Sequence, residues 1–150
     1  MKRLIPLVIA GFIAATGIAG ANDDKGADLS PLDGVDINLN DFLWVARPIV
    51  VFADTPADPR FVEQMELLAA RPEELAARDV VIITDTDPSV RSELRKELRP
   101  RGFMLVVIGK DGNRLRKPAP WDVREITRSI DKMPLRQEEI RLRKAPLSES

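Results

Sequence analysis

The side chains best suited to chemistry in this chain lie in two loops that each follow an apolar run. Residues 54–60 read Asp-Thr-Pro-Ala-Asp-Pro-Arg, and residues 85–87 read Asp-Thr-Asp. If the apolar runs are neighbouring parallel strands, the loops meet beyond the carboxyl ends of those strands, where open α/β sheets bind ligands. Carboxylates at this edge suit a divalent cation, and an arginine at the start of a helix suits an anion.

A cation site would use Asp54, Asp58, Asp85 and Asp87, because calcium and magnesium prefer oxygen ligands. Asp58 and Asp87, however, each precede a proline. This pair of residues is typical of a helix start, where the aspartate accepts backbone N–H bonds as the N-cap and proline fits the first helical position. The chain also contains no Asp-x-Asp-x-Asp-Gly calcium loop. The sequence therefore favours capping roles and predicts no metal and no cofactor.

An anion site would depend on Arg60, in the first turn of the predicted helix. Exposed N–H groups and the positive end of the helix dipole favour phosphate or a carboxylate there. The competing interpretation pairs Arg60 with a nearby aspartate as an ordinary surface ion pair. The candidate ligand-binding residues are Asp54, Thr55, Asp58, Arg60, Gln64 and Asp85.

The composition removes several classes of enzyme. The chain has no Cys, no His and no Tyr. Their absence excludes thiol nucleophiles, disulfide exchange, Ser-His-Asp triads, imidazole bases and Cys/His zinc sites. Lys and Arg number 23 against 24 Asp and Glu, so no excess positive field disposes the chain to bind nucleic acid. We predict no catalytic residue.

The strands that would position these loops follow from apolar patterning. Unbroken apolar runs at residues 49–53, 80–83 and 103–108 predict strands that are buried on both faces. The Asp-Gly turn within residues 109–113 predicts a hairpin into a short strand at residues 114–117.

Helices are predicted after the first strand, after the second strand and at the end of the domain. Asp58-Pro59 and Asp87-Pro88 mark two helix starts, and the second helix would carry an apolar stripe of Val90, Leu94 and Leu98. With right-handed crossovers, the first three strands pair in parallel and the hairpin adds an antiparallel edge. The expected fold is α/β: a thioredoxin-like three-layer sandwich with a mostly parallel four-stranded sheet, a C-terminal β-hairpin and a final helix.

The chain divides into four segments. Residues 1–21 combine a positive start, an apolar stretch and Ala19-Gly20-Ala21, which predicts a signal peptide and a periplasmic or secreted protein; an uncleaved membrane anchor is the alternative. We predict that residues 22–41 form an extended polar arm and that residues 42–134 form the folded domain. Residues 135–150 form a charged C-terminal segment and tail.

Two further groups of side chains are candidates for contacts with a partner. Trp44 and Trp121 lie next to element boundaries, where packing on the core is the favoured role. The basic residues of the C-terminal segment could bind an acidic partner or lipid headgroups, whereas a solvated helix with internal Glu–Arg pairs is the alternative. The candidate partner-binding residues are Arg136, Arg141, Arg143 and Lys144.

Several stretches resemble a known family. They are residues 47–53, 58–60 with Gln64, 78–81, 108–112 and 131–141, of which the closing Met-Pro-Leu-Arg-Gln-Glu-Glu is the most specific. Over about residues 44–143 the chain resembles the family called domain of unknown function 4174, which is similar to domains of the sushi-repeat-containing extracellular proteins. The resemblance implies a thioredoxin-like fold related in shape to peroxiredoxins and an exported location, and it implies no biochemical activity.

The resemblance also allows a comparison of positions. Residues 57–60, Ala-Asp-Pro-Arg, occupy the slot of the thioredoxin Cys-Gly-Pro-Cys motif, and Met104 occupies the slot of the cis-proline. Both marks of thiol–disulfide chemistry are missing, which rules out oxidoreductase and peroxidase activity. We therefore expect an exported non-redox binding or interaction module with a protein partner in the cell envelope, no nucleic acid partner, and no stable membrane span after signal cleavage. The alternative is a small-ligand or anion receptor, or an enzyme, that uses Asp and Arg at the strand-end loops.

Overall fold

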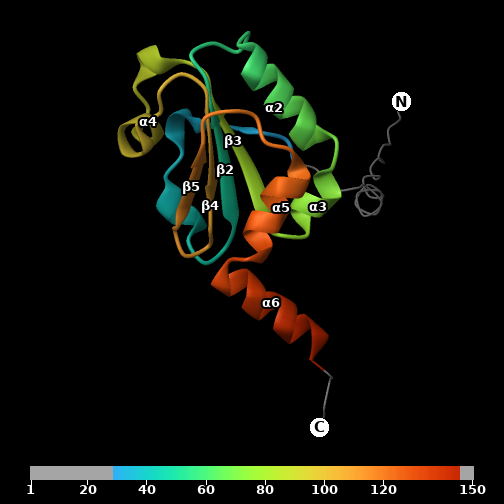
Figure 1. Ribbon diagram of the computed structural model, residues 1–150. Coiled ribbons are helices and arrows are strands. Elements are labelled where there is room, and N and C mark those ends of the chain that lie inside the picture. The colour runs from blue at the N-terminus through green and yellow to red at the C-terminus, as the bar shows by residue number, and fades with distance from the viewer. Residues whose placement is uncertain (1–28, 146–150) are drawn as a thin grey trace, which may run out of the picture.

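The three apolar runs form the centre of the sheet, as their patterns predict. In the computed structural model, which describes residues 29–145, they are β2 (Arg47–Phe52), β3 (Val80–Asp85) and β4 (Met104–Ile108). The predicted hairpin leads into β5 (Arg114–Lys117). With the short β1 (Leu32–Asp33), the strands form one sheet in the order β1-β3-β2-β4-β5 (Figure 1).

Helices cover both faces of this sheet and complete the predicted three-layer sandwich. α2 (Pro59–Ala69), α3 (Pro72–Ala76) and α5 (Val123–Asp131) pack on one face. α4 (Glu93–Leu98) and the 3-10 turn η4 (Leu39–Phe42) pack on the other face. Neighbouring residues of β2 alternate between the two cores, so both faces of the strand are apolar and buried. A last helix, α6 (Pro134–Lys144), projects from the sandwich (Figure 1).

The direction of β4 differs from the prediction. β2 pairs in parallel with β3 but antiparallel with β4, so the third predicted strand is not parallel and the sheet is mixed. The connection from β3 contains a short helix, α4. α4 has 6 residues, about 9 Å of helix, which is about half the length of a six-residue strand. The chain therefore enters β4 at the edge of the sheet where β3 ends, and runs back along β2.

Part of the predicted polar arm belongs to the sheet and its packing. Leu32 and Asp33 pair in parallel with β3, and η3 (Gly34–Asp36) and η4 follow. The polar residues of this segment cap the 3-10 turns: the Asp33 side chain accepts the Val35 N–H at 3.0 Å. Leu39 is buried in the second core. The prediction of an extended arm is therefore wrong for residues 32–41, because apolar residues of this segment pack against the second core.

α4 begins later than the proline signal predicts. Asp87 caps only the 3-10 turn η5 (Pro88–Val90), after which Arg91 adopts a left-handed conformation. Ser92 is the N-cap of α4, and its Oγ accepts the Arg95 N–H at 3.2 Å. Val90 consequently lies outside the apolar stripe and is exposed, whereas Leu94 and Leu98 are buried as predicted.

The predicted signal peptide, residues 1–21, lies outside the described residues, so export stays a prediction. Within residues 29–145, every helix is too short or too polar to cross a membrane.

Candidate functional site

The carboxyl ends of β2 and β3 bring the two predicted loops together. The strands are in register from Arg47 opposite Val80 to Phe52 opposite Asp85, so they end at the same edge of the sheet. The Ala53 N–H donates to the Asp85 carbonyl at 3.1 Å, one step beyond the last pair. Residues 54–60 and residues 85–87 are therefore neighbours, as predicted.

Asp58 and Arg60 form an ion pair with each other at the start of α2. The Asp58 Oδ1 accepts the Arg60 N–H at 2.8 Å, which makes Asp58 the predicted N-cap. The Arg60 guanidinium turns back on the same carboxylate, with Nη2 3.2 Å from Oδ2, and its Cζ lies 5.6 Å from the centre of the Phe103 ring. These bonds from Arg60 hold the pKa of Asp58 below its usual value. The geometry matches the ion-pair interpretation of Arg60, not the anion site.

Asp54 and Thr55 are exposed at the tip of the same loop. The Thr55 Oγ1 accepts the Ala57 N–H at 3.2 Å, and the Thr55 carbonyl accepts the Asp58 N–H at 3.1 Å. Thr55 thus folds the loop ahead of α2 by local side-chain and backbone bonds.

Asp85 is buried, and it belongs to a cluster other than the predicted one. The Arg95 Nε donates to Asp85 Oδ1 at 2.8 Å, and the Ser92 hydroxyl donates to the other carboxylate oxygen. The Arg95 Nη2 also donates to the Ala53 carbonyl at 2.7 Å and the Asp85 carbonyl at 3.0 Å. Arg95 therefore ties α4 to the ends of β2 and β3. Arg95 and Ser92 occupy the Asp85 carboxylate, so the structure does not bring it into an open site with Arg60.

Ser92 and Arg95 are absent from the predicted site. A signal for Ser92 exists in the sequence, because serine before a helix-forming Glu-Leu-Arg-Lys run is typical of an N-cap. No local pattern marks Arg95, whose side chain meets the strand ends only after α4 has packed on the sheet.

Gln64 is fully buried and holds a backbone segment in place. Its Nε2 donates to the Trp121 carbonyl at 2.9 Å, and its Oε1 accepts the Trp121 N–H at 2.9 Å. Both polar groups of the side chain are thus satisfied by the segment that leads into α5. The structure does not support the predicted ligand-binding role of Gln64, because this side chain is buried and its hydrogen bonds are to the Trp121 backbone.

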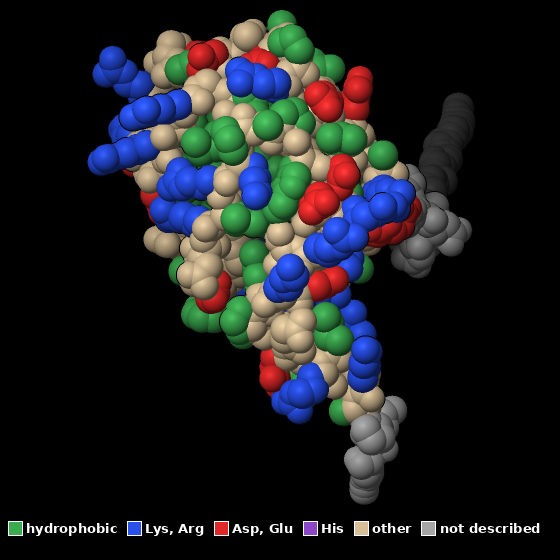
Figure 2. Space-filling model, viewed as in Figure 1, with side chains coloured by type: hydrophobic (Ala, Val, Ile, Leu, Met, Phe, Trp, Pro, Cys, Tyr) green, Lys and Arg blue, Asp and Glu red, His purple; other side chains and the backbone are tan. Residues whose placement is uncertain are grey.

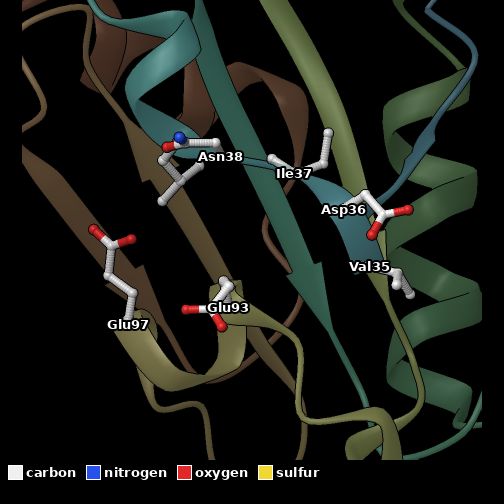
Figure 3. Close-up of a pocket in the computed structure, with 7 residues that line it drawn as sticks. Val35, Asp36, Ile37, Asn38, Glu93 and Glu97 are labelled. Carbon is white, nitrogen blue, oxygen red and sulfur yellow. The ribbon is translucent and has the colours of Figure 1, made fainter.

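Two open hollows lie on the α4 side of the sheet, and neither contains Arg60. One of about 410 Å³ is lined by residues that include Asp33, Asp85 and Asp87. The other, of about 380 Å³, lies between the 3-10 turns and α4, with Glu93 and Glu97 on its wall (Figure 3). Carboxylates in both hollows disfavour anions. Among residues 29–145, no three acidic side chains are arranged to hold a metal ion.

A network of charged side chains fixes α6 to the opposite end of β2. Glu139 accepts hydrogen bonds from Arg47 at 3.3 and 3.2 Å and from Lys110 at 2.8 Å. Arg136 donates to Asp131 at 3.0 Å and to Glu139 at 3.3 Å. Arg136 is 5% exposed, so the structure does not support the predicted partner-binding role for this residue. Its guanidinium instead joins α6 to the end of α5.

The network sets the protonation of its members. Burial raises the pKa of Glu139, but the hydrogen bonds and charges of Lys110, Arg47 and Arg136 outweigh it and lower the pKa to about 2. Burial likewise lowers the pKa of Lys110, and its bonds to Asp79 and Glu139 reverse the effect and raise it. Glu139 is therefore a carboxylate and Lys110 an ammonium ion at neutral pH.

The remaining candidates in the C-terminal segment are exposed. Arg141, Arg143 and Lys144 lie in the last turns of α6, and Arg141 pairs with Glu138 on the same helix. This pair is of the kind that the solvated-helix interpretation predicts. These three residues remain candidates for contact with a partner.

The two tryptophans have different environments. Trp121 packs against the first core, and the Lys117 Nζ lies 4.3 Å from the centre of its ring. Trp44 is 66% exposed and has a φ of 66°, a left-handed conformation that is rare for residues other than glycine. Packing on the core is therefore correct for Trp121 and wrong for Trp44.

The loop that the family resemblance aligns with a thioredoxin active site lacks the chemistry of that site. Residues 57–60 lead into α2, and the Arg60 guanidinium lies over the ring of Phe103, in the turn before β4. Met104 begins β4 opposite Phe52, and no cis peptide bond occurs within residues 29–145. With Ala57 and Arg60 in place of the two thiols, the turn cannot exchange disulfides.

Comparisons with known proteins agree with the fold. Chloroplastic thioredoxin z superposes with a TM-score of 0.54 at 18% identity, over 70% of this chain and 95% of that chain. Reduced 2-Cys peroxiredoxin of Plasmodium vivax superposes with a TM-score of 0.54 at 13% identity, over 69% and 85%. No curated protein matches the chain. The model of the family described as domain of unknown function (DUF4174) matches residues 38–139. The chain therefore belongs to the DUF4174 family, and it is a cysteine-free member with a thioredoxin-like fold.

Proposed function

We propose that this protein is an exported, non-redox binding module that recognises a protein partner in the cell envelope. One observation carries the proposal: the polar side chains at the strand-end edge serve the fold. Asp58 caps α2, Gln64 holds the Trp121 backbone, and Asp85 binds Arg95. A buried group that already has its hydrogen-bond partners gains little by turning to a substrate.

The scaffold itself supports binding rather than chemistry. The solved structure of thioredoxin z is described as defining a type-specific target recognition. A protein of this fold can thus recognise a target, and recognition by shape and charge does not require the thiols. In our proposal this chain keeps such a recognition role without a redox step.

The alternative, a ligand receptor or enzyme at the strand-end loops, has less support. An anion at Arg60 would have to compete with Asp58, whose carboxylate accepts two hydrogen bonds from the guanidinium. Thermal unfolding with calcium, magnesium, phosphate, sulfate and small carboxylates tests this alternative. A ligand at 100 times its Kd adds about 2.7 kcal/mol. A shift of that size that disappears in Arg60→Ala would favour the receptor.

Cross-linking in the producing cells tests the proposed function. A photoreactive amino acid is placed at one exposed position per surface: Trp44, Glu63 on α2, Arg116 on β5 or Arg141 on α6. We expect a discrete cross-linked protein from one surface and none from the others. Absence of a cross-linked partner from every position, with normal amounts of folded protein, would contradict the proposal. The mass of the recovered protein tests export, because cleavage after Ala21 removes residues 1–21.

A further inference from the structure

Among residues 29–145, the strand β5 forms an open edge of the sheet. It pairs with β4 on one side and lies last in the strand order, whereas β1 at the opposite edge has 2 residues. The Gly109 N–H donates to the Asn113 carbonyl at 2.8 Å, and the Gly112 N–H donates to the Gly109 carbonyl at 2.9 Å. With Gly112 at a φ of 89°, these bonds define a three-residue hairpin loop with a glycine bulge.

This hairpin decides which backbone groups of β5 point outward. In an antiparallel pair, residues that exchange hydrogen bonds alternate with residues that do not. Because Gly109 and Asn113 form the first hydrogen-bonded pair, the next is Val107 with Leu115. The N–H and C=O groups of Arg114 and Arg116 therefore point away from β4, where another strand could pair with them.

Basic side chains surround this edge. Arg114 and Arg116 lie on the α4 face, where Arg116 donates to the Leu98 carbonyl. Figure 2 shows Lys and Arg side chains gathered over α4 and β5. We define the basic edge as Arg99, Arg101, Arg114, Arg116 and Lys117.

The charge of the basic edge is local. The described residues 29–145 contain as many acidic as basic side chains, so the domain as a whole is neutral. Of the carboxylates in that range, Glu97 pairs with the basic edge, through Arg114. Most of the positive charge at this edge is therefore open to an acidic partner.

We infer that the basic edge binds an extended acidic segment of the protein partner, which pairs with β5 as a sixth strand. The inference rests on the proposed function and names its surface. Main-chain bonds to Arg114 and Arg116 supply affinity, as in other complexes formed by strand addition, and the side chains supply specificity. The bound segment alternates acidic residues, facing Arg114 and Arg116, with apolar residues on the face of Leu115.

A second copy of the chain does not fit this edge. Pairing β5 with another β5 places arginine and lysine opposite arginine and lysine, and like charges on facing strands repel. Basic side chains on an edge strand are a common device against self-association. The same charges attract an acidic strand, so a different protein is the expected occupant.

Nuclear magnetic resonance titration tests the inference. The ¹⁵N-labelled protein, as recovered from the producing cells, is titrated with a short peptide of alternating glutamate and valine. We expect the largest shifts and slowed hydrogen exchange at the Arg114 and Arg116 amides. As a control that leaves the protein itself unaltered, a matched peptide carries glutamine in place of glutamate. This peptide should bind about threefold to thirtyfold more weakly. Salt should weaken the binding of the glutamate peptide.

Variants locate the site. The double variant Arg114→Gln/Arg116→Gln should bind the glutamate peptide more weakly by a similar factor. The control variant Arg124→Gln/Arg128→Gln, at exposed positions on α5, should bind it with unchanged affinity. Equal affinity for both peptides, or shifts away from β5, would overturn the inference. An oligonucleotide that binds this edge more tightly than the peptide, or self-association that Arg114→Gln/Arg116→Gln abolishes, would also overturn it.

The cross-linking experiment separates this inference from the proposed function. A partner that cross-links from α6 or Trp44 and not from Arg116 overturns the inference about the basic edge. The same result still supports the proposed binding function. Absence of a partner at all positions contradicts the binding module itself, whatever the peptide does.

Discussion

Replacing Glu139 by glutamine tests whether charge holds α6 to the sheet. Glu139 contacts Arg47, which is fully buried, as well as Lys110 and Arg136. Its pKa falls from 4.5 to about 2. At about 1.4 kcal/mol per pKa unit, the carboxylate contributes up to about 3 kcal/mol at neutral pH. Glutamine also leaves the Arg47 charge buried without its counter-ion, a change that costs about 3–5 kcal/mol in other proteins.

Urea unfolding of Glu139→Gln and of the natural chain, followed by circular dichroism, measures this contribution. A lowered pKa in the folded state stabilises above the unfolded value of 4.5 and loses its effect as pH falls through about 2. The difference between the two proteins should therefore be about 3 kcal/mol at neutral pH and shrink between pH 4.5 and about pH 2.

The neighbouring Glu138 provides a matched control for this measurement. Its exposed carboxylate pairs with the exposed Arg141, so Glu138→Gln should change stability by less than about 0.5 kcal/mol. A Glu139→Gln protein within about 0.5 kcal/mol of the natural chain, or a difference that does not change with pH, would refute the reasoning. Packing of α6 against α5 would then carry the attachment.

Three further substitutions test the remaining structural assignments. Gln64→Leu should lower the free energy of unfolding by about 2–4 kcal/mol in thermal melts, because it leaves the Trp121 N–H and carbonyl unpaired in the interior; an unchanged melting temperature would contradict this role. Asp85→Ala should cost about 3–5 kcal/mol in urea, since it removes the counter-ion of Arg95, and a loss below about 1 kcal/mol would return Asp85 to the list of ligand candidates. Trp44→Asn should stabilise by up to about 1 kcal/mol, because asparagine tolerates the left-handed conformation and the exposed ring loses little contact; a clear loss of stability would show that the ring packs in solution.

The sequence predicted the elements of the fold better than their connections. Unbroken apolar runs marked β2, β3 and β4, because a strand that is buried on both faces carries apolar side chains at successive positions. The direction of β4 depends on the length of α4, and a proline signal at Asp87 made that helix look longer than it is. β1 carried no pattern at all, because two residues are too few to show a period.

The sequence predicted where the candidate site lies in the fold, but it did not predict the hydrogen-bond partners of the site residues. The pairing of β2 and β3 placed the two loops together, and Asp58 caps α2 as its proline neighbour indicates. Gln64 bonds to Trp121 in the segment before α5, 57 residues along the chain, and Asp85 bonds to Ser92 and Arg95 at α4, 7 and 10 residues along. No local spacing encodes such pairs, because they depend on how the helices pack.

The polar and charged side chains at the two edges of the sheet differ in how much they contribute to the fold. At the strand-end edge, a thioredoxin keeps reactive groups, whereas here Gln64 and Asp85 are buried and hydrogen-bonded, so that removing either lowers stability. At the basic edge, side chains such as Arg99 and Arg101 are exposed, and exposed charges contribute about 0–1 kcal/mol to a fold. Stability alone therefore does not require several basic residues around one unpaired strand, whereas recognition of an acidic strand requires both the charges and the open backbone groups.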